Sequence, residues 1–143
     1  MHNYITTKTM GEAMTVLRRY DVLRDINSDL SGLACIVSSM SEQYAEDGCD
    51  LSLVAQSLDL MHAALRDVLD SMSTANNGAL DYAQVSEQSA NVMECAALLE
   101  RLAASDCDLN ESRQEIADTS KKLETVFETL DRIVDSAPVY QFE

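Results

Sequence analysis

Apolar residues recur every three or four positions along most of this chain. That spacing places side chains on one face of an α-helix, whereas a half-buried strand would need strict alternation. The four apolar stripes are Leu23, Ile26, Leu30, Leu33, Val37, Met40 and Tyr44; Leu51, Val54, Leu58, Met61, Leu65, Val68 and Met72; Tyr82, Val85, Ser89, Val92, Ala96, Leu99 and Ala103; and Leu109, Ser112, Ile116, Thr119, Leu123, Val126, Leu130, Ile133 and Ala137. The pattern predicts four amphipathic helices that pack at a shallow angle.

Polar breaks with helix-stop and helix-cap residues separate these stripes at 46–49, 75–78 and 105–108. They predict helices over the ranges 9–46, 50–75, 80–105 and 108–137. Short connections make consecutive helices antiparallel. The predicted fold is therefore all-α, a single domain over residues 1–143 that forms an up-down-up-down antiparallel four-helix bundle, and we expect no strand.

The first predicted helix is long, and its apolar phase changes near its middle. The early positions are Met10, Ala13, Leu17 and Tyr20, and the next step to Leu23 is only three residues. Such a slip overwinds or bends a helix, so we expect a bend near residues 20–29. The polar residues 27–29 could instead break the helix. We favour continuity, because the stripe runs through them unchanged.

Charge narrows the choice of partner. The chain of 143 residues carries 25 acidic and 10 basic side chains, for a formal net charge of −15. Direct binding of nucleic acid needs clustered Lys and Arg, so it is not expected. A field of this sign steers basic molecules and raises their association rate. We therefore expect a protein partner of basic character, for example a nucleic-acid-binding protein whose groove the carboxylates would occupy in place of phosphates.

Candidate chemistry is sparse in this sequence. The segment His62-Ala63-Ala64-Leu65-Arg66 resembles the histidine segment of histidine-phosphotransfer four-helix bundles, which implies a signalling role for His62. Those bundles carry a basic residue three positions on and a glycine at four, whereas here the basic residue is at four and no glycine follows. A histidine at the surface or at the edge of the core is the alternative.

Metal, cofactor and thiol chemistry are not indicated. No Glu-x-x-His pair of the di-metal bundle type occurs, and no phosphate-binding glycine loop is present. The cysteines Cys35, Cys49, Cys95 and Cys107 form no C-x-x-C pair, so we expect free thiols. We expect no cofactor, no metal and no catalysis.

Two surfaces are candidates for protein binding. Leu53 and Leu60 lie off the main stripe of the second helix, on a line with Ser57 and Ala64. A second apolar line needs a second covering surface, which predicts a homodimer, or else central burial of this helix within one bundle. The other candidate is an acidic end of the bundle, made of Glu42, Glu46, Asp47, Asp50, Asp106, Asp108 and Glu111.

The two ends of the chain form a third candidate. An odd number of reversals places both termini at the same end of a four-helix bundle, so the arm with Tyr4 and the tail with Tyr140 and Phe142 should meet. Aromatic side chains bury large apolar areas. The two arms are therefore expected to cover the open end of the core, and the alternative is that the tail docks on a partner.

The expected function is that of a non-catalytic protein that binds another protein, as adaptor, chaperone or inhibitor. The alternatives are the phosphotransfer module centred on His62 and a structural accessory domain of the prophage type. No apolar run approaches the roughly 20 residues that span a bilayer. The first residues lack the pattern of a signal peptide, so a cytoplasmic protein without membrane association is expected.

Overall fold

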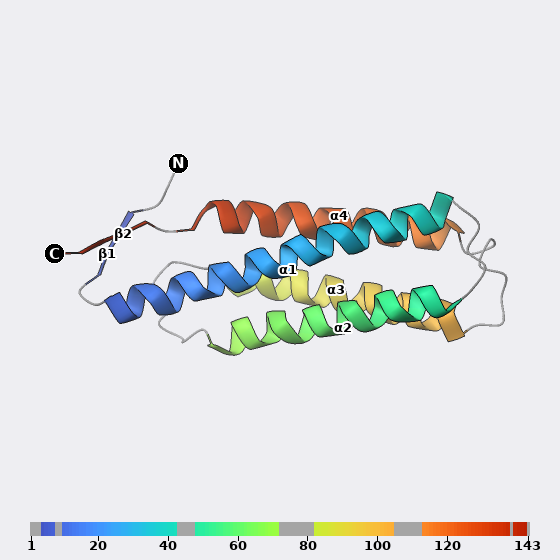
Figure 1. Cartoon of the computed structure of the whole chain (residues 1–143), viewed down its shortest axis with the longest axis horizontal. Coiled ribbons are helices and arrows are strands. Elements are labelled where there is room, and N and C mark those ends of the chain that lie inside the picture. Colours follow the sequence, from blue (N-terminus) through green and yellow to red (C-terminus); the bar gives the residue numbers. More distant parts are fainter. Residues whose placement is uncertain are drawn as a thin grey trace.

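The computed structural model describes residues 4–7, 10–42, 48–71, 82–104, 113–137 and 139–142. These residues form four α-helices, α1 (Met10–Glu42), α2 (Gly48–Ser71), α3 (Tyr82–Ala104) and α4 (Arg113–Asp135), and two short strands, β1 (Tyr4–Thr7) and β2 (Val139–Phe142). The helices lie side by side along one axis (Figure 1). The predicted four-helix bundle is confirmed.

The helices associate in two close pairs. α2 packs most closely on α3, and α1 packs on α4, while α1 with α2 and α3 with α4 complete the ring. Small residues explain the close approach of α1 and α4. In α1 and α4, the Ser120 hydroxyl donates to the carbonyl oxygen of Ala34 at 3.3 Å, and Ala34 is 4% exposed. The wider spacing falls between α1 and α2, where two hollows of the described surface lie.

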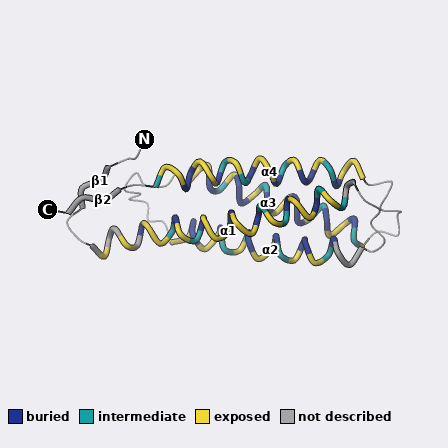
Figure 2. The backbone as a smooth tube through the Cα atoms, turned by 45° about the horizontal axis from the view of Figure 1, so that its top comes forward, coloured by how far each residue is buried: buried dark blue, intermediate teal, exposed yellow. Residues whose placement is uncertain are grey.

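The core follows the predicted stripes. In α2 the residues Leu51, Leu58 and Leu65 are fully buried, and the α4 stripe from Ile116 to Ile133 is buried throughout. Buried positions face the interior on each helix, and exposed positions face outward (Figure 2). The predicted burial of one stripe residue is wrong, because Tyr82, the first residue of α3, is 48% exposed.

α1 is one uninterrupted helix, so the alternative of a break at residues 27–29 is wrong. The predicted change of phase is also wrong, since Val16 is buried while Leu17 is 36% exposed. Buried positions on α1 then follow regular steps of four and three: Val16, Tyr20, Leu23, Asn27, Leu30, Ala34 and Val37. Asn27 occupies a core position in this series, and the helix continues through the polar segment.

α4 ends two residues before the predicted limit of 137. The backbone amide of Ala137 donates to the carbonyl oxygen of Val134 at 3.1 Å, a tighter turn than an α-helix makes. Pro138 follows, and a proline disfavours helical dihedrals in the residue before it. The remaining predicted helix limits, at residues 9, 46, 50, 75, 80, 105 and 108, lie outside the described residues or within two residues of the described helix ends.

The two chain ends form a small parallel sheet, so the prediction of no strand is wrong. Tyr4 pairs with Val139 and Thr7 pairs with Phe142. The prediction that the two arms meet is confirmed by this pairing, which lies beyond one end of the bundle (Figure 1). A two-stranded pairing of segments so distant along the chain has no local signature in the sequence, which explains the error.

Candidate functional site

The apolar line of α2 that lies off the core remains at the surface. Leu60 is 74% exposed and Leu53 is 61% exposed, the two largest values among the large apolar side chains of the described residues. Both lie on the side of α2 that also carries Ser57 and Ala64, as the spacing of three and four predicts. Central burial, the alternative for this line, is therefore excluded within a single chain.

Leu60 borders a hollow between α1 and α2 of about 500 Å³. The apolar lining comes from both helices, and it consists of Ile26, Gly32, Leu33, Ile36, Leu60, Met61 and Ala64. Ile36 is itself 48% exposed. A side chain added at Gly32 would meet nothing within 4 Å, so this glycine leaves open space on the α1 side.

A second hollow of about 420 Å³ continues the first along the same pair of helices. Ala64 lines both, so the two hollows are parts of one depression, which we call the α1–α2 groove. The second hollow is lined by Arg18, Arg19, Val22, Ala64, Asp67, Val68 and Ser71. The groove therefore has one apolar half and one half with charged walls.

Arg19 closes the charged end of the groove. Its guanidinium donates to the Ser71 hydroxyl at 3.1 Å and to the Ser71 carbonyl oxygen at 2.5 Å. Ser71 is the last described residue of α2, where carbonyl groups lack partners within the helix and a cation is favoured. Arg19 thus joins α1 to the end of α2.

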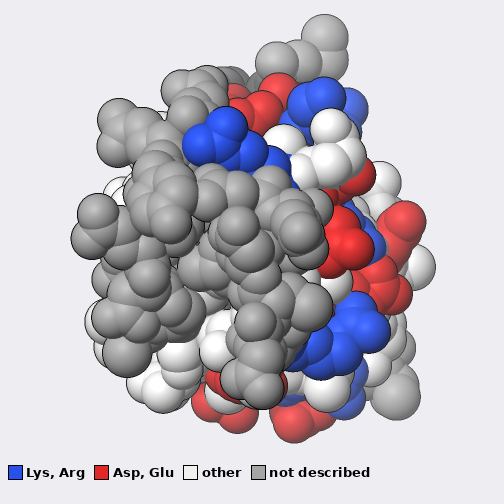
Figure 3. All heavy atoms as spheres, turned by 90° about the vertical axis from the view of Figure 1, so that its right-hand side faces the viewer, with Lys and Arg blue, Asp and Glu red and all other residues white. Residues whose placement is uncertain are grey.

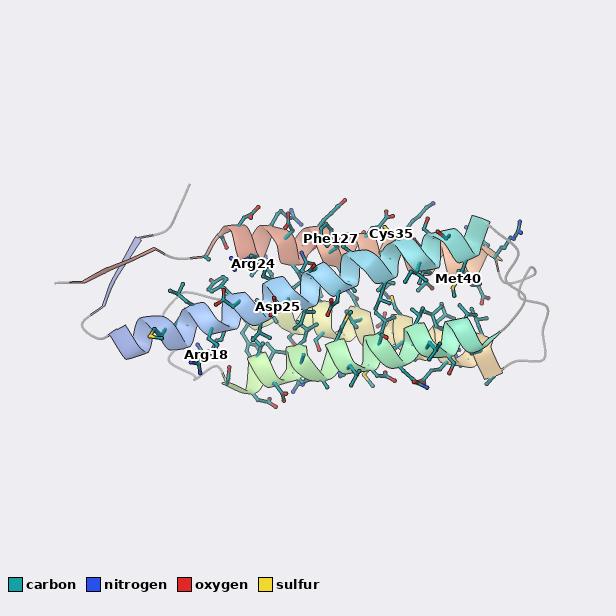
Figure 4. All side chains as sticks on the ribbon, viewed as in Figure 1. Arg18, Arg24, Asp25, Cys35, Met40 and Phe127 are labelled. Atoms are coloured by element: carbon teal, nitrogen blue, oxygen red, sulfur yellow. The ribbon has the colours of Figure 1, made fainter. Side chains whose placement is uncertain are left out.

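The groove is balanced in charge, unlike the protein as a whole. The charged residues that line it are Arg18, Arg19, Asp29 and Asp67. Within the described residues, Arg18 and Asp67 make no ion pair. Arg18 lies on the α2 side of α1 (Figure 4). Both charges are exposed and remain available to a molecule that covers the groove.

The predicted acidic end lies largely outside the described residues. Of its seven members, Glu46, Asp47, Asp106, Asp108 and Glu111 fall in segments that are not described, and the side chains of Glu42 and Asp50 are not described either. Figure 3 views that end of the bundle, and the described acidic and basic groups around it are intermingled. Tyr140 and Phe142 belong to β2, and the description covers their backbone pairing only.

His62 is half-buried and is held by α3. Its Nδ1 atom lies 2.9 Å from the Ser89 hydroxyl oxygen and 3.0 Å from the Ser89 carbonyl oxygen. A protonated Nδ1 would donate to the carbonyl, and an unprotonated one would accept from the hydroxyl. Ser89 is only 1% exposed, so a substrate cannot reach its hydroxyl, and the pair does not form a hydrolytic site.

A small hollow of about 120 Å³ lies between α3 and α4. It contains Cys95 and is bordered by an ion pair between Lys122 and Glu94. Burial raises the pKa of the Cys95 thiol to about 11, against a weaker opposite effect of Lys122. A protonated thiol is a poor nucleophile and a poor metal ligand. Cys95 and Cys35 are free, as predicted, and the thiols of Cys49 and Cys107 lie outside the described side chains.

Two acidic side chains meet on the surface of α2 and α3. Protonated Glu100 donates a hydrogen bond to the Asp59 carboxylate, and this bond, together with the repulsion between the two charged forms, raises the pKa of Glu100 above its ordinary 4.5. Among the described residues no group of three or more His, Cys, Asp or Glu side chains is placed to hold a metal ion. Because the pKa of Glu100 is raised in the folded state, this surface pair affects how the stability of the protein depends on pH.

Comparisons with known proteins were negative. No family model, curated protein or solved structure matches the chain. None of the described helices is both long enough and apolar enough to span a bilayer.

Proposed function

We propose that this protein is a non-catalytic binding module that recognises another polypeptide through the α1–α2 groove. The observation that carries the proposal is the exposure of Leu60, 74%, beside an apolar hollow of about 500 Å³. An apolar patch that spans two helices is costly to leave in water and is typical of a binding surface.

The shape of the groove favours a helical ligand. A depression between two antiparallel helices accepts the apolar face of a third helix, which contacts it through residues spaced by three, four and seven positions. Leu60 on one wall and Ile36 on the other supply exposed apolar contacts in the groove, and Leu53 continues the exposed apolar line of α2 outside its lining. The roles of adaptor, chaperone and inhibitor are all compatible with such a contact.

The basic character of a partner rests on a different feature, the net charge of −15. The groove itself is balanced in charge, so a basic partner would gain most from acidic surfaces outside the groove. Raised salt would then weaken its binding, because exposed charges are screened within about 10 Å at moderate ionic strength. The phosphotransfer and structural alternatives have no comparable feature in their favour.

The proposal is tested by capture from a native lysate with the immobilised chain. Leu60→Glu places a charge in the apolar half of the groove and should abolish capture. Met93→Glu is the matched control, because Met93 is 54% exposed on α3, away from the groove. Both variants should keep the wild-type helical content. Capture that survives Leu60→Glu, or is lost equally with Met93→Glu, contradicts the proposal.

A catalytic signalling role is tested separately. Incubation of the wild-type protein with acetyl phosphate or a cognate kinase would yield a phosphohistidine at His62 if this residue were a phosphotransfer site. We expect no phosphorylation, and a stable phosphohistidine that disappears in His62→Gln would replace the binding-only proposal.

A further inference from the structure

We infer that the occupant of the α1–α2 groove is a second copy of this chain, related by a two-fold axis that runs along the groove. The inference rests on the proposed binding function and specifies its partner. Three features of the groove lead to it: its charge balance, the match between its two walls, and its size.

Charge favours a second copy over a basic ligand. The lining carries two arginines and two aspartates in a protein of net charge −15. A basic ligand in the groove would face Arg18 and Arg19, whereas two acidic copies repel least where their surfaces are balanced. Interface centres are also depleted of charge, and Asp29 is the single charged residue among the described residues that line the apolar half of this groove.

The two walls of the groove carry complementary groups within each half. In the charged half, Arg18 of α1 and Asp67 of α2 line the same hollow. In the apolar half, Ile36 of α1 and Leu60 of α2 line the same hollow. Each half therefore holds one residue on α1 that suits contact with a residue on α2.

A two-fold axis along the groove uses this complementarity twice. It places α1 of each copy against α2 of the other and keeps each half of the groove opposite the same half of the other copy. Arg18 then shares the charged half of the interface with Asp67 of the other copy, and Ile36 shares the apolar half with Leu60 of the other copy. An axis across the groove would instead place identical helices together, so the arginine would not meet the aspartate.

The size of the groove is adequate for a weak dimer. From Arg18 to Ile36 the helix rises about 27 Å, and two helices together are about 20 Å wide. The footprint is then about 500 Å² on each copy, or about 1,000 Å² in total, which is the lower limit for a specific interface. The native mass should therefore depend on protein concentration.

The experiment is sedimentation equilibrium of the full chain at micromolar and at near-millimolar concentrations. We expect the wild type to pass from monomer to dimer. Leu60→Glu and, independently, Ile36→Glu should weaken dimerisation at least about tenfold, because each would place a charge in a dry contact. Both positions are exposed in one chain, so both variants should remain helical. Met93→Glu should dimerise as the wild type does.

The register is tested by charge reversal. Arg18→Asp and Asp67→Arg should each weaken the dimer, and the double variant should restore it. Asp131→Arg on the exposed side of α4 is the control and should have no effect. Single reversals without effect, or a double variant that is not rescued, overturn the two-fold arrangement.

The outcomes separate the inference from the proposed function. A wild type that stays monomeric at all concentrations overturns the dimer, and the capture experiment with Leu60→Glu then decides alone whether the groove binds another protein. A wild-type dimer that survives both Leu60→Glu and Ile36→Glu overturns the assignment of the groove to a second copy.

Discussion

Replacement of Asn27 by leucine should stabilise this protein. Asn27 lies on α1 at a core position, is 5% exposed, and its side-chain oxygen Oδ1 has no hydrogen-bond partner among the described residues. A buried carbonyl oxygen without a partner costs about 1–3 kcal/mol relative to hydration. Leucine has the same branching at Cγ and carries no polar atom, so Asn27→Leu removes this cost.

The magnitude follows from two opposing effects. Removal of the unpaired oxygen gains about 1–3 kcal/mol, and the fit of a slightly larger side chain into a packed core costs part of that. We expect a net gain of about 1–2 kcal/mol in the free energy of unfolding. For a domain of this length that corresponds to an increase of about 3–8 °C in melting temperature.

The assay is urea unfolding followed by far-ultraviolet circular dichroism, at one protein concentration for all variants because a dimer would add to stability. Asn91→Leu is the matched control. The Asn91 amide donates to Gln88 Oε1 at 3.4 Å, and Gln88 is 6% exposed, so its loss leaves a buried acceptor unpaired and should destabilise. A lower free energy of unfolding for Asn27→Leu, with helical content unchanged, would refute the reasoning and show that the Asn27 oxygen is hydrogen-bonded in solution.

Three further predictions concern pH, the thiols and the chain ends. Because Asp59 raises the folded pKa of Glu100, the folded state binds that proton more tightly than the unfolded chain does, and the melting temperature should rise as pH falls from 7 toward the ordinary value of 4.5. In thermal melts this rise should be smaller for Asp59→Asn than for the wild type, whereas the control Glu87→Gln should show the wild-type rise. Parallel curves for the wild type and Asp59→Asn would contradict the assignment. With a thiol pKa of about 11, Cys95 should react with a disulfide reagent far more slowly at neutral pH than the exposed Cys35. Cys35→Ala should therefore remove one fast-reacting thiol, and Cys95→Ala should remove none. Equal losses in the two variants would contradict the burial of Cys95. Deletion of residues 139–143 removes β2 and should cost about 1–2 kcal/mol of stability if the paired arms cover the core, whereas unchanged stability with lost partner capture would show that the tail docks on a partner.

The periodicity of apolar residues was sufficient to predict the helices and most of their buried faces. Val54, Leu58, Met61 and Leu65 on α2 are buried as their spacing indicates. The reason is physical: a helix presents its side chains every 3.6 residues, so a stripe in the sequence is a stripe in space before any packing takes place. The apolar line of Leu53 and Leu60 outside the core stripe could be predicted from the sequence for the same reason.

Other features depend on contacts between distant segments. Val16 and Leu17 are both apolar neighbours on α1, and only the position of the neighbouring helices decides that Val16 is covered and Leu17 is not. Asn27 looks like a helix-breaking residue in sequence, and it is buried because the core positions on either side of it, Leu23 and Leu30, keep that face inward.

The tertiary structure alone also decided the strand pair and the groove. Tyr4 and Val139 pair across nearly the whole chain, a contact whose loop-closure cost is met only after the bundle has brought both ends together. The α1–α2 groove exists because α1 pairs more closely with α4, and α2 with α3, than they do with each other. The amphipathic pattern of each helix is a local property, whereas the choice of its closest neighbour depends on how the side chains of all four helices fit together.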